Sequence, residues 1–470
     1  MSKRMQKDEL EALTKKLLIR RTNGCLRVPA DQLAEADRYC EGYKKFMNAV
    51  KTEREAVAYA VGQAEQAGFV PFRPGETYRP GDKVYCSNRG KALTLAVIGK
   101  NGCRGGARIA AAHIDSPRID LKPHPLYEKD GLSLFKTHYY GGIKKYQWTA
   151  IPLAMHGHIV LKNGRQLDVS IGEKTGEPRF CITDLLPHIA GEQMKKTLSE
   201  GIGGEDLNIV TGSRPVFAEE DGKDLIKLNV MKILNERYGM MEEDFVSADI
   251  EFVPAFPAED IGFDGSMVGA YAQDDRVCAY PALTALMDAP VPESTAVTVL
   301  ADREEIGSVG NTGLNSRFLS DFIADLAWAE GLEARRVLSL SECLSADVTA
   351  AYDPTYPDVF EPVNSCYLNG GAGLAKYTGG RGKSGTSEAS AEFVGKIRRL
   401  FDENGVLWQM GEIGKVDAGG AGTVAKFVAG LNIDVIDIGV PVLSMHSPFE
   451  VVSKLDVYMT YKGIRTFLSR

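Results

Sequence analysis

The sequence predicts an α/β fold in which a mixed sheet is covered by helices and interrupted by an inserted, mainly β domain. Three observations predict it. Apolar residues recur at helical spacing near the N-terminus, strand-like pieces alternate with turns in the middle of the chain, and helices alternate with strands in the C-terminal part. We therefore expect a discontinuous domain over residues 1–117 and 258–470, and a second domain over residues 118–257.

The N-terminal part is predicted to be helical and then to form strands. Two groups of apolar residues carry the helical spacing: Leu10, Leu13, Leu17 and Leu18, and then Ala34, Tyr39, Phe46 and Val50. Three short apolar runs follow at residues 83–86, 93–98 and 108–112, bounded by glycine or asparagine, as is typical of strands with a buried face. His113 then stands at the end of the third strand.

The middle and the C-terminal part differ in their patterns. Between about Pro117 and Pro257, strand-like pieces such as 158–161 and 167–170 alternate with polar turns, which indicates a largely β insertion. From Ala270 onward, the sequence predicts this order of elements: a helix over 279–286, a strand over 296–300, a helix over 318–329 and a strand over 336–340. Such alternation is typical of a sheet covered by helices.

Composition excludes several classes of partner. A net charge of -8 argues against nucleic acid and membrane surfaces, which need a concentrated positive field. No apolar stretch approaches the roughly 20 residues that span a bilayer, and the charged start leads into a helix rather than a signal-peptide core. The eight cysteines are scattered without CxxC pairs, so we expect them to be reduced and mostly buried. The cytoplasm is the expected location.

His113 and Asp115 are the first candidate site residues. Residues two apart in a strand lie on the same face, so the imidazole can bind a metal while the carboxylate orients it. A histidine held only by structural hydrogen bonds is the alternative interpretation of this pair.

Carboxylates near a helix start and after a strand extend the pattern. Asp274 and Asp275 open a helix, where the helix dipole stabilises carboxylates even without a metal. Glu304 and Glu305 lie in a charged segment that directly follows the strand ending at Leu300. Side chains at the carboxyl ends of strands in α/β sheets usually line the functional crevice, although a polar loop is the alternative.

Asp347 and His446 complete the set. Each follows an apolar strand, around Cys343 and over residues 435–443 respectively, and each has an alternative: a helix N-cap for Asp347 and a buried structural imidazole for His446. Two imidazoles with several carboxylates suit zinc or a similar divalent ion, and a shared aspartate can hold two such ions about 3.5 to 4 Å apart. A remaining glutamate can take the proton from a bridging water.

Two glycine-rich segments are expected to be loops. Residues 369–385 are predicted to be mobile, and the end of this segment lacks the first glycine of a phosphate-binding loop because Tyr377 stands there. Residues 420–425 have the outline of a dinucleotide fingerprint without a convincing βαβ unit around them. We expect a loop whose backbone approaches the active site closely.

The ordered set of motifs resembles the aspartyl aminopeptidase family of metallo-aminopeptidases (peptidase family M18), which also includes the vacuolar aminopeptidase. The resemblance covers nearly the full chain and rests on these segments: Ala112–Pro117, Asp274–Asp275, Glu304–Ser308, Ser345–Asp347, and Met445–Ser447 followed by Glu450. It implies a zinc-peptidase-like catalytic domain interrupted by a dimerisation domain, which helps to build a tetrahedral dodecamer with an internal chamber.

The resemblance also implies a role for each residue. Five residues would hold two zinc ions: His113 and Asp347 the first, Glu305 and His446 the second, with Asp274 shared. Asp115 would orient His113, and Glu304 would be the general base. His188, in the segment Leu186–Ala190, would reach into a neighbouring subunit's active site and stabilise the developing oxyanion; packing at an interface is the alternative.

The implied activity is that of a binuclear zinc aminopeptidase acting on peptides with a free N-terminus, with Co²⁺ or Mn²⁺ able to substitute. Asp275 stands where family members usually carry asparagine, and the family's Lys-x-Asn and Arg-Tyr segment is not reproduced at residues 368–377. Preference for acidic or for neutral N-terminal residues therefore stays open. A related binuclear deacylase or carboxypeptidase and a non-catalytic assembly subunit are the alternatives.

Overall fold

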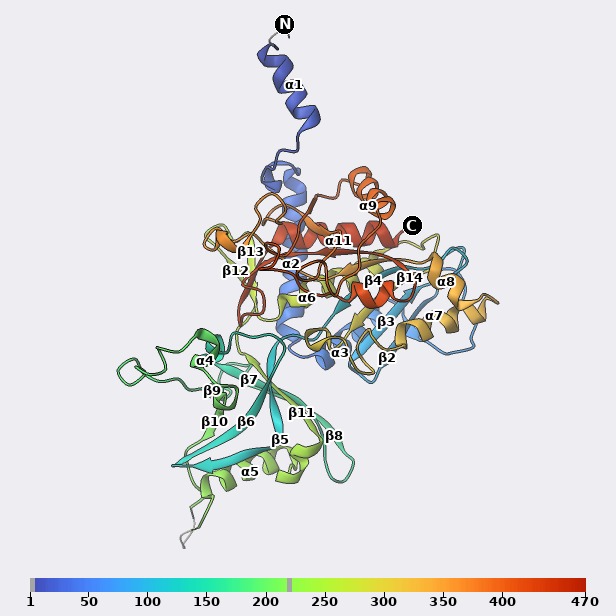
Figure 1. Ribbon diagram of the computed structural model, residues 1–470. Helices are drawn as coiled ribbons and strands as arrows, with labels where there is room; N and C mark the ends of the chain where they lie inside the picture. Colours follow the sequence, from blue (N-terminus) through green and yellow to red (C-terminus); the bar gives the residue numbers. More distant parts are fainter. Residues whose placement is uncertain (1–4, 218–221) are drawn as a thin grey trace.

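The chain folds into a larger α/β part and a smaller sheet with its own helix (Figure 1). The computed structural model describes residues 5–217 and 222–470, so the first four residues of the charged start lie outside it. The chain leaves the larger part after β4 (Arg108–His113) and is back in it by β12 (Glu259–Ile261), ahead of α6 (Gln273–Asp288). The predicted α/β class with a mainly β insertion is confirmed; the boundaries at residues 118 and 257 stay a prediction.

A nine-stranded mixed sheet forms the centre of the larger part. Its strands, in spatial order, are β1 (Val70–Pro71), β2 (Lys83–Asn88), β3 (Ala92–Val97), β14 (Ala296–Ala301), β4, β15 (Glu342–Ala346), β19 (Asp434–Gly439), β17 (Ala372–Ala375) and β18 (Trp408–Met410). The four middle strands β14, β4, β15 and β19 run parallel. Their carboxyl ends therefore meet at one edge of the sheet.

Helices cover both faces of this sheet, which is why its strands are apolar on both sides. Ala110 and Ala112 of β4 pack with one helix layer, and Ile109 and Ala111 pack with the other. The first layer consists of α2 (Ala30–Ala49), α3 (Glu53–Gln66), α6, α9 (Ala391–Glu403) and α11 (Lys454–Leu468). The second consists of α7 (Phe318–Ala329), α8 (Ala334–Leu340) and α10 (Ala425–Ala429).

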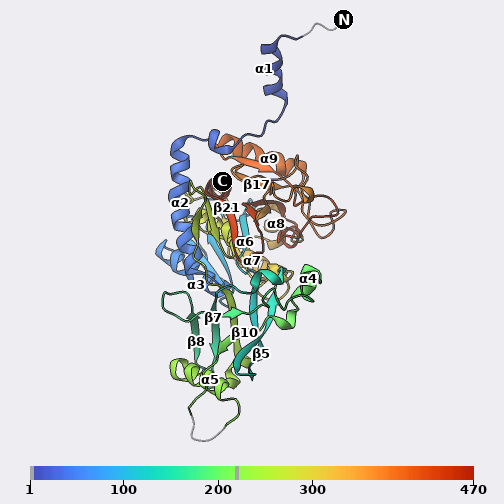
Figure 2. The ribbon, with the colours of Figure 1, turned by 90° about the vertical axis from the view of Figure 1, so that its left-hand side faces the viewer.

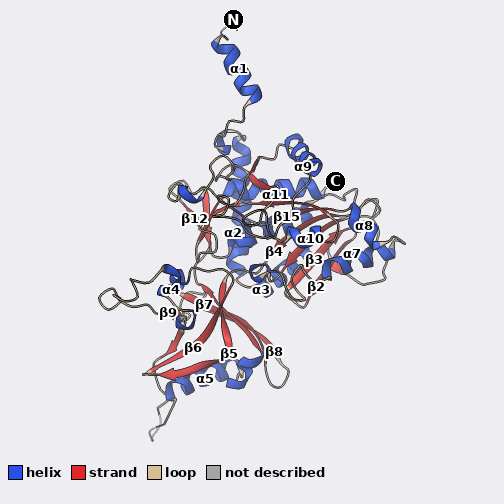
Figure 3. Cartoon of the chain, viewed as in Figure 1, coloured by secondary structure: helices blue, strands red, loops and turns tan. Residues whose placement is uncertain are grey.

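The inserted part is a seven-stranded antiparallel sheet (Figure 3). Its strands, in spatial order, are β8 (Gln166–Ile171), β7 (Leu153–Val160), β11 (Ala248–Pro254), β5 (Arg118–Lys129), β6 (Leu132–Tyr140), β10 (Ile209–Gly212) and β9 (Cys181–Ile182). The helix α5 (Leu225–Tyr238) packs on it, and α4 (Leu198–Gly201) lies near its edge. Phe135, Trp148 and Phe252 are in a separate apolar core here, so the sheet does not depend on the central sheet for burial.

A third sheet brings three candidate segments together. Its strands, in order, are β12 (Glu259–Ile261), β13 (Met267–Ala270), β21 (Glu450–Ser453), β20 (Pro441–Leu443) and β16 (Thr349–Ala350). Asp274 follows β13, His446 follows β20, and Asp347 precedes β16. Pairing of these strands therefore places the three residues near one another.

Three local predictions were wrong. Residues 336–340 lie in helix α8, because Ala334, Val337 and Leu338 pack on the sheet at helical spacing; the strand is Glu342–Ala346. The strand expected over 435–443 is divided between two sheets, β19 and β20.

The third error concerns the glycine-rich segment 369–385, which was expected to be a mobile loop. Ala372–Ala375 is the buried strand β17 of the central sheet. Gly371, at the start of this strand, serves close packing, since a Cβ there would lie 2.1 Å from the carbonyl oxygen of Leu407.

The predicted N-terminal helix is confirmed but stands away from the body of the protein. Helix α1 (Lys7–Leu17) projects beyond α2 in both views (Figures 1 and 2). Its residues Leu10, Leu13 and Leu17 are exposed. Among the residues that the structure describes, no helix combines the length and the apolar character that crossing a membrane requires.

Candidate metal centre

The candidate residues meet at the carboxyl edge of the parallel strands. His113 is the last residue of β4, and Asp347 follows β15 directly. Glu304 and Glu305 lie in a short 3-10 turn (Glu304–Ile306) after β14. Asp274 is at the start of α6, and His446 follows β20. Five separate elements therefore deliver their side chains to one place, as expected for a functional crevice of an α/β sheet.

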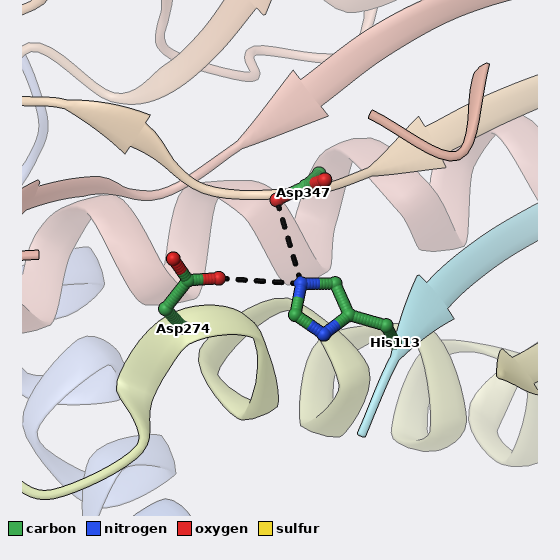
Figure 4. A group of neighbouring side chains, drawn as sticks. All are labelled: His113, Asp274 and Asp347. Atoms are coloured by element: carbon green, nitrogen blue, oxygen red, sulfur yellow. Dashed lines mark ion pairs between the residues drawn. The ribbon is translucent and has the colours of Figure 1, made fainter. Parts of the chain in front are cut away.

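The first group of side chains comprises His113, Asp274 and Asp347 (Figure 4). His113 Nε2 lies 3.3 Å from Asp274 Oδ1 and 3.8 Å from Asp347 Oδ1. One ligand atom from each residue lies within 4.8 Å of the others. The His113 side chain is only 1% exposed, so its imidazole is buried.

The second group comprises Asp274, Glu305 and His446. His446 Nε2 lies 3.1 Å from Asp274 Oδ2 and 3.4 Å from Glu305 Oε2. The two oxygens of Asp274 thus point to different histidines. This is the arrangement that a carboxylate shared between two ions requires.

Asp115 joins the first group to the turn that carries the glutamates. Its Oδ1 lies 3.3 Å from His113 Nδ1, and its carboxylate accepts hydrogen bonds from the backbone N–H groups of Glu304 and Glu305 at 3.1 and 3.2 Å. The backbone oxygen of Asp115 also lies 3.0 Å from His113 Nδ1. Asp115 therefore lies behind the imidazole of His113, where the orienting partner of a metal ligand would be expected.

Glu450 and Asp275 support the ligand segments, and sequence reasoning gave neither residue this role. Glu450 accepts hydrogen bonds from the backbone N–H of Asp274 at 3.1 Å and from that of His446 at 2.8 Å. Asp275 accepts one from the backbone N–H of His113 at 3.2 Å. For Glu450, the only signal in the sequence was its position four residues after His446.

Tyr140 and Gly142 of the inserted part were also missed. The Tyr140 hydroxyl donates to Asp115 Oδ2 at 2.8 Å, and the carbonyl oxygen of Gly142 lies 2.8 Å from His446 Nδ1. Nothing in the sequence pattern links these residues to the site, because the contact depends on the return of a hairpin.

The pKa directions reflect crowding of carboxylates around two imidazoles. Burial, followed by the negative charge of Asp274, raises the pKa of Glu305 well above its ordinary value. Burial also raises the pKa of Glu304. For His446, burial lowers the pKa, but the hydrogen bond to Asp274 and the charge of Glu305 outweigh it and raise the pKa to about 10. The site thus has a strong excess of negative potential.

These donors fit a divalent cation. Asp274 Oδ1 and Glu305 Oε1 are buried and have no hydrogen-bond partner among the described residues, which is costly for a carboxylate unless a cation binds it. Both imidazoles have Nδ1 engaged and Nε2 turned toward the carboxylates. Imidazole nitrogen and carboxylate oxygen are a donor set that zinc accepts.

A cavity of about 350 Å³ opens over both groups. Asp274, Glu304, Glu305, Asp347 and His446 line its floor, together with residues 421–423. The loop predicted over residues 420–425 thus reaches the cavity with residues 421–423. Its backbone also packs closely on a neighbouring loop, since a Cβ on Gly420 would lie 2.0 Å from the carbonyl oxygen of Gly379. Glu304 Oε2 lies 3.9 Å from His113 Nε2, beside both groups and in contact with the cavity.

His188 is the one predicted site residue that the chain does not bring to the candidate metal centre. It is exposed, in the segment between β9 and α4. Its predicted role requires a neighbouring subunit and stays a prediction.

Comparison with known proteins agrees with this site. Residues 46–468 match the family model described as aminopeptidase I zinc metalloprotease (M18). A probable M18 family aminopeptidase 1 of Clostridium acetobutylicum is 48% identical over 446 residues, which cover 93% of this chain and 96% of the relative.

Solved structures give the same result. An M18 family aminopeptidase from Thermotoga maritima superimposes with a TM-score of 0.91 at 42% identity, covering 96% of this chain and 100% of that one. An S. cerevisiae mApe1 dodecamer shares the fold, with a TM-score of 0.74 at 20% identity over 93% of this chain and 97% of that one. The chain therefore belongs to the M18 family of zinc metalloproteases and is a metallo-aminopeptidase, as the sequence motifs implied.

Proposed function

We propose that the protein is a binuclear zinc aminopeptidase that removes N-terminal amino acids from peptides. The observation that carries this proposal is the sharing of Asp274 between two groups of metal-capable side chains. His113, Asp274 and Asp347 would hold one ion, and Asp274, Glu305 and His446 the other. Co²⁺ and Mn²⁺ accept similar donors and would substitute for zinc.

Bound zinc would supply Lewis-acid polarisation of the scissile carbonyl and a more acidic water. Residues of the chain itself transfer the proton and orient the metal ligands. Glu304 holds a proton-accepting carboxylate at the cavity, and its raised pKa brings it nearer to the range in which a general base works well at neutral pH. The same carboxyl group then returns the proton to the leaving amine. Asp115 keeps His113 oriented throughout.

Selection of the N-terminal residue takes place in the same cavity. Val348, Ile413, Phe427 and Met445 offer an apolar lining, whereas Lys426 adds one cationic side chain. The apolar lining suits neutral side chains, and Lys426 suits acidic ones. A panel of amino-acid anilides, assayed on the wild type and on Lys426→Met, decides the preference: loss of activity toward aspartyl and glutamyl substrates alone would assign acidic specificity to Lys426.

The proposal includes assembly into a dimer-based tetrahedral dodecamer through the inserted sheet. A dodecamer of the more distant yeast protein and the exposed apolar residues Leu185, Leu186 and Ile189 around His188 support it. His188 would then stabilise the oxyanion in a neighbouring active site. Solution mass gives the oligomer size, and His188→Ala should lower kcat without changing that mass.

Metal content and substrate choice test the activity. The purified protein should contain two zinc ions per chain and cleave an aminoacyl anilide, and chelation should abolish cleavage. Hydrolysis of an N-acylated amino acid instead of the anilide would indicate a deacylase or carboxypeptidase. Absence of both metal and chelator-sensitive hydrolysis would indicate a non-catalytic assembly subunit.

The cytoplasm remains the predicted location. All eight cysteines are free thiols, and five of them are buried (Cys40, Cys103, Cys278, Cys343 and Cys366). Free thiols suit a reducing compartment. Cell fractionation measures the location directly.

A further inference from the structure

One short segment of the inserted sheet contacts the outer side of both candidate metal-binding histidines. Tyr140, the last residue of β6, holds Asp115, and Asp115 lies behind His113 Nδ1. Two residues later, the carbonyl oxygen of Gly142 lies 2.8 Å from His446 Nδ1. Acceptors on both Nδ1 atoms favour the tautomer whose Nε2 lone pair faces the carboxylates of the cavity.

We propose that residues 140–142 are a positioning element for both imidazoles, through which the inserted sheet sets the zinc affinity of the active site. The inference rests on the proposed zinc-binding function and adds a role for the inserted part that is separate from subunit assembly. Tyr140 is a positioning residue here, because it acts on the metal site through Asp115.

The course of the chain explains how the segment reaches the site. The hairpin β5–β6 begins at Arg118, three residues after Asp115, and Arg118 pairs directly with Tyr140 in the antiparallel register. The root of the hairpin therefore lies beside the metal centre, although its other end extends far into the inserted sheet (Figure 3). A register slip of one residue would turn Tyr140 to the opposite face and remove its contact with Asp115.

A buried charge cluster fixes the position of Tyr140. The Arg118 guanidinium lies 3.8 Å from the centre of the Tyr140 ring, in cation–π geometry. Arg118 is also 3.2 Å from Glu251 of β11 and 3.6 Å from Glu53 of α3. Two elements, β11 of the inserted part and α3 of the larger part, thus hold the cation on which the tyrosine packs.

Two glycines let the segment approach the second group of ligands. Gly141 has φ +75°, and a Cβ there would lie 3.4 Å from Glu305 Oε2. A Cβ on Gly142 would lie 3.4 Å from His446 Nδ1. Alanine at Gly141 would need a left-handed backbone conformation that L-residues rarely adopt. Gly141 therefore favours glycine because of its backbone conformation, whereas a Cβ on Gly142 would make an ordinary van der Waals contact with His446.

Zinc affinity of Tyr140→Phe tests the inference. The substitution removes one hydroxyl and keeps the ring under Arg118. Loss of the partner that directly orients a ligating imidazole weakens metal binding about 10–100-fold. Tyr140 acts one contact further out, through Asp115, so we expect a loss of about tenfold in a competition titration of the full chain with a chromophoric chelator and Zn²⁺. The Co²⁺-loaded variant should also show a changed visible spectrum.

The matched control is Tyr139→Phe. Tyr139 is the neighbouring residue of β6, is exposed, and makes no hydrogen bond through its hydroxyl within the described chain. It should bind Zn²⁺ like the wild type. Gly141→Ala addresses the other histidine and should weaken the second zinc by a similar factor, with the first zinc retained.

The outcomes separate this inference from the proposed function. Zn²⁺ binding by Tyr140→Phe equal to that of the wild type would overturn the positioning role while leaving the binuclear site intact. The metal-free Tyr140→Phe protein could also melt well below the metal-free wild type. If its loss of zinc affinity were no larger than this loss of stability explains, Tyr140 would act in folding alone and the positioning role would be overturned too. A wild type without zinc affinity would instead reject the proposed function itself.

Discussion

The two groups of metal-capable side chains differ in how they are enclosed. His113 is 1% exposed and is backed by the buried carboxylate of Asp115, whereas the His446 side chain is 35% exposed and is backed by a backbone carbonyl oxygen. They share Asp274, whose two oxygens face one histidine each. The two groups therefore differ at their histidines: the first group has a buried histidine and is called the closed group, and the second has a partly exposed histidine at the cavity and is called the open group.

The difference has a physical origin in the fold. His113 lies at the end of a central strand covered on both faces, so its surroundings are dry and its orienting partner is charged. His446 follows the short strand β20 of the third sheet, at the rim of the cavity. An ionised orienting partner makes an imidazole a stronger ligand than a neutral carbonyl does. We therefore expect the closed group to bind its ion more tightly.

The largest effect should come from removing the residue that both groups share. Asp274→Ala should lose both ions and lower kcat/KM by more than about 10⁴-fold, because the polarisation of substrate and water is lost together. Metal analysis and anilide hydrolysis measure it. Asp434→Ala, at an exposed position at the start of β19, is the control and should keep both ions. Retention of one tightly bound ion by Asp274→Ala would show that the groups are independent.

The next effect separates proton transfer from metal binding in both groups. Glu304→Gln should lower kcat by about 10²–10⁴-fold, since a general base contributes that much, while both zinc ions stay bound. The variant keeps the size of the side chain and loses only the proton acceptor. Wild-type turnover would refute the role of Glu304, and loss of zinc would make it a ligand of one group instead of the base.

The sequence predicted the surroundings of His113 better than those of His446. His113 and Asp115 are two residues apart in a strand, so strand periodicity alone places them together. The carboxylates after β14 and β15 were also predictable, because parallel strands end at a common edge. The mixed sheet and the inserted β part followed from local patterns in the same way.

The surroundings of His446 were not predictable from local patterns. They depend on contacts between distant segments: Gly142 lies 304 residues before His446, and Glu450 bridges His446 to Asp274 across two strands of the third sheet. The division of residues 435–443 between two sheets has a similar cause. The chain passes so close to the Asp347 carbonyl that a Cβ on Gly439 would lie 1.8 Å from it, and no pattern in the sequence reports that approach.

A smaller effect should distinguish the affinities of the two groups. On chelation the ion of the open group should leave first, with an affinity about tenfold weaker, because its histidine lacks a charged partner and is exposed. Zinc content and activity followed against chelator concentration should show two steps. His446→Ala should remove the weaker step and leave the tighter one. A single step for two ions would mean that the shared Asp274 couples them too strongly for the difference in enclosure to matter.

The smallest effect concerns the pH dependence of stability, where protons and zinc compete for the same nitrogens. The folded pKa of His446 is raised to about 10, above its ordinary value near 6.5, because of Asp274 and Glu305 once the opposing effect of burial is outweighed. A raised histidine pKa stabilises the metal-free fold fully below about pH 6.5, and this contribution is lost as the pH rises through about 10. Burial and the charge of Asp274 raise the pKa of Glu450 to about 8. This shift also makes the metal-free fold less stable as the pH rises above the ordinary pKa of a glutamate.

The melting temperature of the metal-free protein should therefore decrease as the pH rises from about 6.5 to 9. Zinc binds neutral imidazoles, so the melting temperature of the zinc-loaded protein should decrease less over the same range. The increase in melting temperature on adding zinc should grow with pH across this window. His446→Gln should flatten the metal-free curve. The part of the slope that comes from His113 should remain, because the nearby carboxylates of Asp115 and Asp274 outweigh burial and also raise the pKa of His113. An increase that stays constant with pH would mean that the imidazoles are already neutral in the metal-free protein. The contrast between the two groups would then lie in their enclosure alone and not in their protonation.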